Sequence, residues 1–183
     1  MAATMADMYV PLFGQRLAHM SPVVAGFFGA ALSVGWTVGE IASASLRNER
    51  TIVWVVVMAP LVMAAGWVLS AVAQQDGAAM GWIVLWGLGL VLAGSGVGMA
   101  WPHLSAWAMS RDDPAEGSIA AAAINTVQLI CGAFGAGLAG VVVNMSDTED
   151  ATSARWLFAV FSAMAALGCV ASYQASRGQN TTI

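Results

Sequence analysis

Residues 51–73 read TIVWVVVMAPLVMAAGWVLSAVA, and no charged side chain interrupts them. A membrane helix needs about 20 consecutive apolar residues to cross a hydrocarbon core roughly 30 Å thick. The stretch meets that requirement. It is also too long for the ~10-residue strands of a membrane barrel and lacks their alternating pattern. It therefore predicts a transmembrane helix.

Four further apolar runs flank this one, and short polar connections separate them. They lie at residues 22–46, 78–109, 117–143 and 154–173. The composition agrees, since 59% of the residues are hydrophobic, 9% are charged and the mean hydropathy is +0.76. A soluble domain carries about 25% charged residues. The sequence predicts an all-α integral membrane protein with about five transmembrane helices.

The first 21 residues differ from the rest of the chain. Asp7 and Pro11 interrupt their apolar part, and about 13 helical residues reach only ~20 Å. We expect residues 1–21 to hold the remnant of a truncated transmembrane helix and an outer loop. Residues 22–173 then form a five-helix transmembrane domain, and residues 174–183 form a cytoplasmic tail. This organisation predicts a partial chain.

Arginine distribution predicts the orientation, because positive residues mark the cytoplasmic side of a membrane. With five crossings, four arginines fall on one side and two on the other. The first side has Arg47, Arg50, Arg111 and Arg177, and the second has Arg16 and Arg155. We expect a multi-pass protein of the plasma membrane with its N-terminus outside and its C-terminus in the cytoplasm.

Glu40 is the one acidic residue well inside a predicted span, and a carboxylate in hydrocarbon needs an explanation. Small and polar residues share its helix stripe, which we expect to face other helices or a wet cavity: Gly29, Ser33, Thr37, Glu40 and Ala44. Phe27, Phe28 and Leu32 lie largely off this stripe. One interpretation makes Glu40 a proton or cation site. The other, which the sequence favours, pairs it with Arg47 or Arg50 near the cytoplasmic interface.

A second stripe follows the run at residues 117–143 with helical spacing. Its members are Ser118, Ala121, Asn125, Gln128, Gly132, Gly135 and Ala139. Asn125 and Gln128 either line a substrate path or hydrogen-bond across a tight helix contact that the glycines allow, and the second arrangement is commoner. Two GxxxG pairs also predict helix packing, namely Gly94 with Gly98 and Gly35 with Gly39.

The sequence argues against several other classes of protein. No basic face is present to bind nucleic acid, and no P-loop, HExxH or GxSxG motif points to an enzyme, a cofactor or a catalytic metal. Cys131 and Cys169 lie within apolar runs, which favours packing over a disulfide. We interpret His103, after Trp101 and Pro102, as a residue of the cytoplasmic interface.

Several short motifs resemble major facilitator superfamily transporters of the multidrug:proton antiporter type. Tyr9-Val-Pro-Leu-Phe13, Ser21-Pro-Val-Val-Ala-Gly26 and Gly35-Trp-Thr-Val-Gly39 are similar to the family's seventh and eighth helices. Gly94-x-Gly-x-Gly98 with Pro102, followed by Asn125-x-x-Gln128, resembles its tenth and eleventh helices. The likeness covers residues 8–173 and implies the C-terminal half of such a transporter, without most of the seventh helix.

The resemblance implies a function and partners. It makes Gly39, Arg47 and Arg50 part of a cytoplasmic gating loop, although the family's usual aspartate is missing. It implies proton-coupled export of small amphipathic or drug-like molecules, through a path that needs the N-terminal half or a second copy. The chain alone would then be inactive. The alternative is a small self-standing membrane protein that acts as a structural or modulatory subunit.

Overall fold

A computed structural model of the chain describes residues 2–109, 114–145 and 150–179, and these residues form helices and connections without a strand. Five segments are long and apolar enough to cross a membrane, at Pro22–Ala44, Glu49–Val72, Met80–Met109, Gly117–Met145 and Asp150–Gln174. The prediction of an all-α membrane protein with five spans is confirmed. The helices are α1 (Ala2–Leu17), α2 (Pro22–Gly29), α3 (Ala31–Ala44), α4 (Glu49–Val72), α5 (Met80–Met109), α6 (Pro114–Met145) and α7 (Asp150–Gln179).

Local sequence explains where two of the spans begin. Ser21 caps α2 by accepting a hydrogen bond from the Val24 amide at 3.4 Å, and Pro22 follows as the first helical residue, where its missing N–H costs nothing. Asn48 caps α4 by accepting from the amides of Arg50 and Thr51. Helices α2 and α3 belong to a single span, with a break at Ala30.

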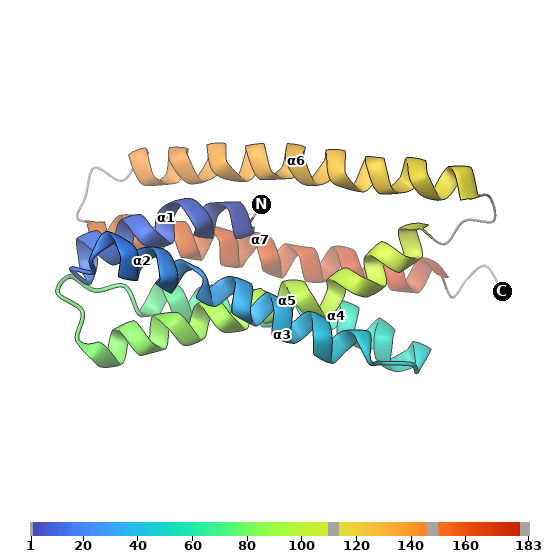
Figure 1. Cartoon of the computed structure of the whole chain (residues 1–183), viewed down its shortest axis with the longest axis horizontal. Coiled ribbons are helices and arrows are strands. Elements are labelled where there is room, and N and C mark those ends of the chain that lie inside the picture. The colour runs from blue at the N-terminus through green and yellow to red at the C-terminus, as the bar shows by residue number, and fades with distance from the viewer. Residues whose placement is uncertain (1, 110–113, 146–149, 180–183) are drawn as a thin grey trace.

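Helices α3, α4, α5 and α7 form the packed bundle, in which α5 contacts both α3 and α4, and α4 contacts α7. Figure 1 shows α6 running along one edge of this bundle, with the short α1 between α6 and the remaining helices. The last turns of α5, after Pro102, rise toward the α6 side. Pro102 lies inside this helix and removes a backbone N–H from it.

Aromatic side chains fill the core where α4, α5 and α7 meet. Trp67 stacks on Phe158 with ring centroids 5.7 Å apart, and both side chains are fully buried. Trp86 meets Phe158 edge to face at 6.2 Å and Phe28 at 4.9 Å. Aromatic pairs in these arrangements add about 0.5–1.5 kcal/mol beyond the area they bury. This cluster fixes α7 against the centre of the bundle.

One end of the molecule is tied together by polar contacts. Arg16 pairs with Asp150 at 2.9 Å, which joins α1 to α7. The amide of Gly77 donates to the carbonyl of Leu17 at 3.0 Å, and Arg155 Nε donates to the carbonyl of Gln74 at 2.9 Å. The end of α1, the α4–α5 connection and the start of α7 therefore lie at the same end of the bundle.

Helix α6 has little contact with its neighbours. Of its described side chains, only Gly135 and Ala139 are buried, and Gly140 lies near the hydroxyl of Tyr9 on α1. The half of α6 before these residues, from 117 to 130, is mostly exposed. Gln128, which belongs to this half, lines the candidate site.

Candidate functional site

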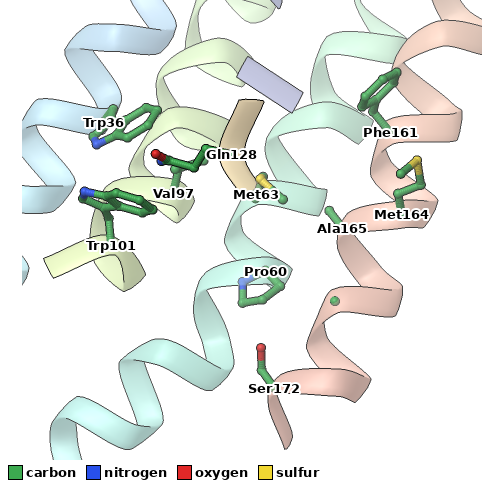
Figure 2. Close-up of a pocket in the computed structure, with 11 residues that line it drawn as sticks. Trp36, Pro60, Met63, Val97, Trp101, Gln128, Phe161, Met164, Ala165 and Ser172 are labelled. Atoms are coloured by element: carbon green, nitrogen blue, oxygen red, sulfur yellow. The ribbon is translucent and has the colours of Figure 1, made fainter. Parts of the chain in front are cut away.

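A partly open pocket of about 390 Å³ lies between the exposed first half of α6 and helices α3, α4, α5 and α7. Pro60, Val97 and Gln128 each come from near the centre of their spans, so this part of the pocket lies at the depth expected for the hydrocarbon core, whereas Ser172 is near the end of the span Asp150–Gln174. Figure 2 shows its lining residues. They are Trp36 of α3, Pro60 and Met63 of α4, Val97 and Trp101 of α5, Gln128 of α6, and Phe161, Met164, Ala165, Gly168 and Ser172 of α7.

The pocket has an aromatic wall and two uncharged polar groups. Trp36 and Trp101 meet edge to face with ring centroids 6.3 Å apart. In Figure 2 the side chain of Gln128 extends from α6 toward both indoles, whereas Ser172 lies at the opposite end beside Pro60. Neither the Gln128 amide nor the Ser172 hydroxyl hydrogen-bonds to a described residue. Such an arrangement can hold an apolar molecule and offer it hydrogen bonds.

The structure separates the two polar candidates of α6. Both residues are exposed, but Gln128 lines the pocket and Asn125 does not. The small residues of the predicted stripe are less exposed than Asn125 and Gln128, since Gly135 and Ala139 are buried and Gly132 is half-buried. The stripe therefore describes the packed second half of α6 and not its exposed first half.

Glu40 lies half-buried on α3, one turn beyond Trp36, and does not line the pocket. The pairing that the sequence favoured is absent from this structure: no ion pair joins Glu40 to Arg47 or Arg50, all three of which are described, and both arginines are exposed. Asn48 starts α4 immediately after the turn, so Arg47 and Arg50 project near a helix end with access to water.

The close contact of α3 with α5 depends on glycines of both helices. A Cβ added to Gly94 would collide with the carbonyl oxygen of Leu32, and one added to Gly98 with that of Trp36. On the other side, a Cβ on Gly39 would lie 2.6 Å from the carbonyl oxygen of Ser95. Gly39, assigned to a gating loop by resemblance, thus lies within a helix contact in this structure.

Apart from Gly29, the predicted stripe of α3 does not pack against the other described helices, so a wet cavity remains as its expected surroundings. Ser33, Thr37 and Ala44 are exposed, and of this stripe only Gly29 is buried. The buried line consists of Leu32, Gly35, Gly39 and Ser43. The physical reason is the glycine pair, which lets the two backbones touch and gains more packing than a polar face could offer.

Ser43 and His103 form a buried contact at one end of the α3–α5 interface. The Ser43 hydroxyl donates to the carbonyl of Met99 at 2.6 Å, and His103 Nε2 lies 2.8 Å from the same hydroxyl oxygen. Because the single hydroxyl hydrogen goes to Met99, we infer that Nε2 carries a hydrogen and donates to Ser43. His103 is only 9% exposed and packs into the α3–α5 contact; its expected place at the cytoplasmic interface stays a prediction.

The sequence did contain a signal for this contact. Ser43 follows Gly35 and Gly39 at intervals of four residues, which extends the same packing face of α3. What the sequence lacks is the register of the partner helix, which places the turn of His103 opposite Ser43.

The fold and the pocket define a multi-pass integral membrane protein with an uncharged, aromatic-walled pocket at the depth of the membrane core. Two curated proteins of Mycobacterium tuberculosis, from strain CDC 1551 / Oshkosh and from strain H37Rv, are similar to this chain, and each is named a probable multidrug-efflux transporter. Each is 61% identical over 177 residues, which is 96% of this chain but 38% of the relative. The chain thus spans about two fifths of the relatives' length. No protein-family model and no solved structure matches it.

Proposed function

We propose that the chain works as part of a multidrug-efflux transporter of the major facilitator type in the plasma membrane. Identity of 61% across 96% of the chain, with proteins named probable multidrug-efflux transporters, is the observation that carries this proposal, and the major facilitator type rests on the resemblance of the sequence motifs. The five spans and the pocket at mid-membrane depth are compatible with it, because many transporters bind substrate near the midplane between helices. The proposed activity moves a molecule without changing it covalently.

In this proposal the chain forms one wall of the translocation path and is inactive alone. The exposed first half of α6 offers a mixed polar and apolar surface to a partner, and the exposed Ser33 and Thr37 of α3 add polar surface. Alternating access requires a second body against which these helices move. The partner would be another transporter half or a second copy of the chain.

Glu40 is the proposed proton-coupling group. A carboxylate in a span is costly unless it has a function or a partner, and Arg47 and Arg50 do not neutralise it in this structure. Replacing Glu40 by glutamine should leave the fold intact and abolish the dependence of export on a proton gradient. Export that follows the gradient equally well in the variant would remove Glu40 from the coupling step.

The alternative of a self-standing subunit that pairs through glycine faces loses its main support. The Gly35–Gly39 and Gly94–Gly98 faces already contact each other within the chain, so they are not free to bind a neighbour. The exposed residues of α6 remain for a partner, and these fit the transporter proposal equally well.

An exchange experiment tests the proposed function. The matching stretch of one Mycobacterium relative is replaced by this chain, and efflux of Nile red, an uncharged planar aromatic dye, is measured in a strain without its own exporters. We expect the chimera to export Nile red, and neither the chain alone nor the relative without this stretch to do so. A chimera that reaches the membrane folded but does not export contradicts the proposal, as does saturable export by the chain alone.

A further inference from the structure

The pocket lining contains no ionisable side chain, and this decides which molecules it can hold. Its polar groups are the amide of Gln128 and the hydroxyl of Ser172, both able to donate and accept a hydrogen bond. Glu40 is the nearest carboxylate along α3, one turn from Trp36, but it is not part of the lining. A bound ion would therefore have no opposite charge in contact with it.

The Gln128 amide has no hydrogen-bond partner among the described residues. It lies near the middle of its span, on the exposed first half of α6. Polar groups in a hydrocarbon environment lose their bonds to water, and this loss is unfavourable unless another partner replaces the water. An alkyl chain cannot do so. A ligand with an amide-like group, which both donates and accepts, matches both ends of the glutamine side chain.

The other walls favour a flat aromatic body. Two indoles, Trp36 and Trp101, lie where the Gln128 amide points (Figure 2), and aromatic rings gain from offset or edge contact with indole faces. Met63 and Met164 face them across the pocket, and thioethers adapt their shape to an aromatic edge. A volume of about 390 Å³ falls within the range of small-molecule sites.

A charged ligand of the same shape would bind less well. An indole attracts a cation, but stripping water from an ammonium group without a carboxylate in contact costs more than that attraction returns. An anion would lack both a positive charge and a favourable aromatic face. The absence of charge from the described lining thus selects against ions of either sign.

We infer that the pocket binds uncharged, planar aromatic molecules that carry an amide-like hydrogen-bonding group, and that Gln128 recognises this group. The inference deepens the proposed function, on which it rests for the idea that such a molecule is exported. Binding itself requires no export, so the two ideas fail separately. If the chain binds these molecules but the chimera does not export, only the proposed function is contradicted.

The test uses three probes with one ring system and different charges: 1-naphthamide, 1-naphthylmethylammonium and 1-naphthoate. Binding to the full chain in lipid nanodiscs is measured by equilibrium dialysis, after subtraction of the uptake by empty nanodiscs. We expect saturable binding of 1-naphthamide, at least roughly tenfold tighter than that of either ion. Equal uptake of all three, or uptake no greater than by empty nanodiscs, overturns the inference.

Two matched variants assign the recognition to Gln128. Gln128→Leu keeps the size of the side chain but removes its hydrogen bonds, and should weaken 1-naphthamide binding about tenfold, which is the size of one good hydrogen bond. Asn125→Leu makes a comparable change less than one turn away, outside the lining, and should leave binding unchanged. Equal effects of the two variants, or none from Gln128→Leu, would contradict the role of Gln128. Unchanged thermal unfolding of both variants excludes a folding defect as the cause.

Discussion

Glycine residues determine how closely α3 and α5 approach. Gly94 has the carbonyl of Leu32 where a Cβ would stand, whereas Gly137 in α6 has no atom within 4 Å of that position. In an open helix position, alanine is favoured over glycine by about 0.5–1 kcal/mol. At a contact of two backbones the same methyl group forces the helices apart, at a cost of about 1–3 kcal/mol.

We therefore expect opposite effects from one substitution at two sites. Gly94→Ala should lower the free energy of unfolding by about 1–3 kcal/mol, and Gly137→Ala should leave it unchanged or raise it slightly. Unfolding of the detergent-solubilised chain by SDS, followed by circular dichroism, provides the measurement. Equal tolerance of both alanines would mean that α3 and α5 are farther apart than in this structure.

The Ser43–His103 contact makes a second prediction for single residues. Ser43→Ala leaves a buried imidazole N–H without its acceptor and should cost about 1–3 kcal/mol of unfolding free energy. Combining it with His103→Leu should cost less than the sum of the two single changes, because both polar partners are then removed. The same unfolding assay completes this double-mutant cycle.

The proton on Nε2 gives this cycle a further control. A neutral imidazole with its hydrogen on Nε2 and a protonated imidazole both donate from this atom. The coupling between Ser43 and His103 should therefore persist when the cycle is repeated at pH 8 and at pH 6. A coupling that vanishes at the lower pH would contradict the assignment of His103 as the donor.

At the scale of the helix, α6 divides into two parts with different environments. Its later part is packed, with Gly135 and Ala139 buried and Gly140 near Tyr9 of α1, and its earlier part is exposed and borders the pocket. The exposed fraction of the side chain is 67% at Leu129 and zero at Ala139. About three turns of one helix thus separate an exposed residue from a buried one.

Cysteine labelling can test this division of α6. In a chain with both native cysteines replaced, Leu129→Cys should react quickly with a pyrene maleimide in detergent, and Ala139→Cys should react slowly until the chain is unfolded. Fast labelling at both positions would show that α6 is detached from α1 as well. Slow labelling at both would show that its first half is covered.

The sequence predicted which segments are helical better than it predicted which face of each helix is buried. Apolar length decides the spans, and the predicted run at 51–73 and the observed Glu49–Val72 differ by at most two residues at either end. Which face of a helix is buried depends on the helix that packs against it. Asn125 and Gln128 share one stripe in the sequence, yet only Gln128 borders the pocket, because a 3.6-residue period leaves a face about 100° wide.

The pocket could not be predicted from the sequence for a related reason. Trp36, Pro60, Trp101 and Gln128 come from four spans with no common motif, and each tryptophan alone reads as an interfacial or lipid-facing residue. Only the packing of α3 against α5 brings the two indoles together. The sequence shows which residue types each span carries. Which of these residues meet in a pocket depends on the register between the helices.

At the scale of the whole molecule, the polar ties at one end fix which connections share a side of the membrane. Arg16 with Asp150, and Leu17 with Gly77, bring the end of α1, the α4–α5 connection and the start of α7 together. The connection between α3 and α4 lies at the other end of the spans that it joins; it carries Arg47, and Arg50 follows in the first turn of α4. Positive residues favour the cytoplasm, so this second end should be cytoplasmic.

Reporter fusions test this orientation directly. A fusion after Arg50 should report the cytoplasm, one after Gln75 the outside, and those that follow should alternate: Arg111 inside, Asp147 outside and Arg177 inside. The two fusions at Gln75 and Asp147 are coupled, because the connections that carry them lead to residues that meet at one end of the bundle. Both on the cytoplasmic side would invert the orientation but keep the fold. Opposite signals from these two would contradict the five-span arrangement itself, since α5 and α6 could not then both cross the membrane.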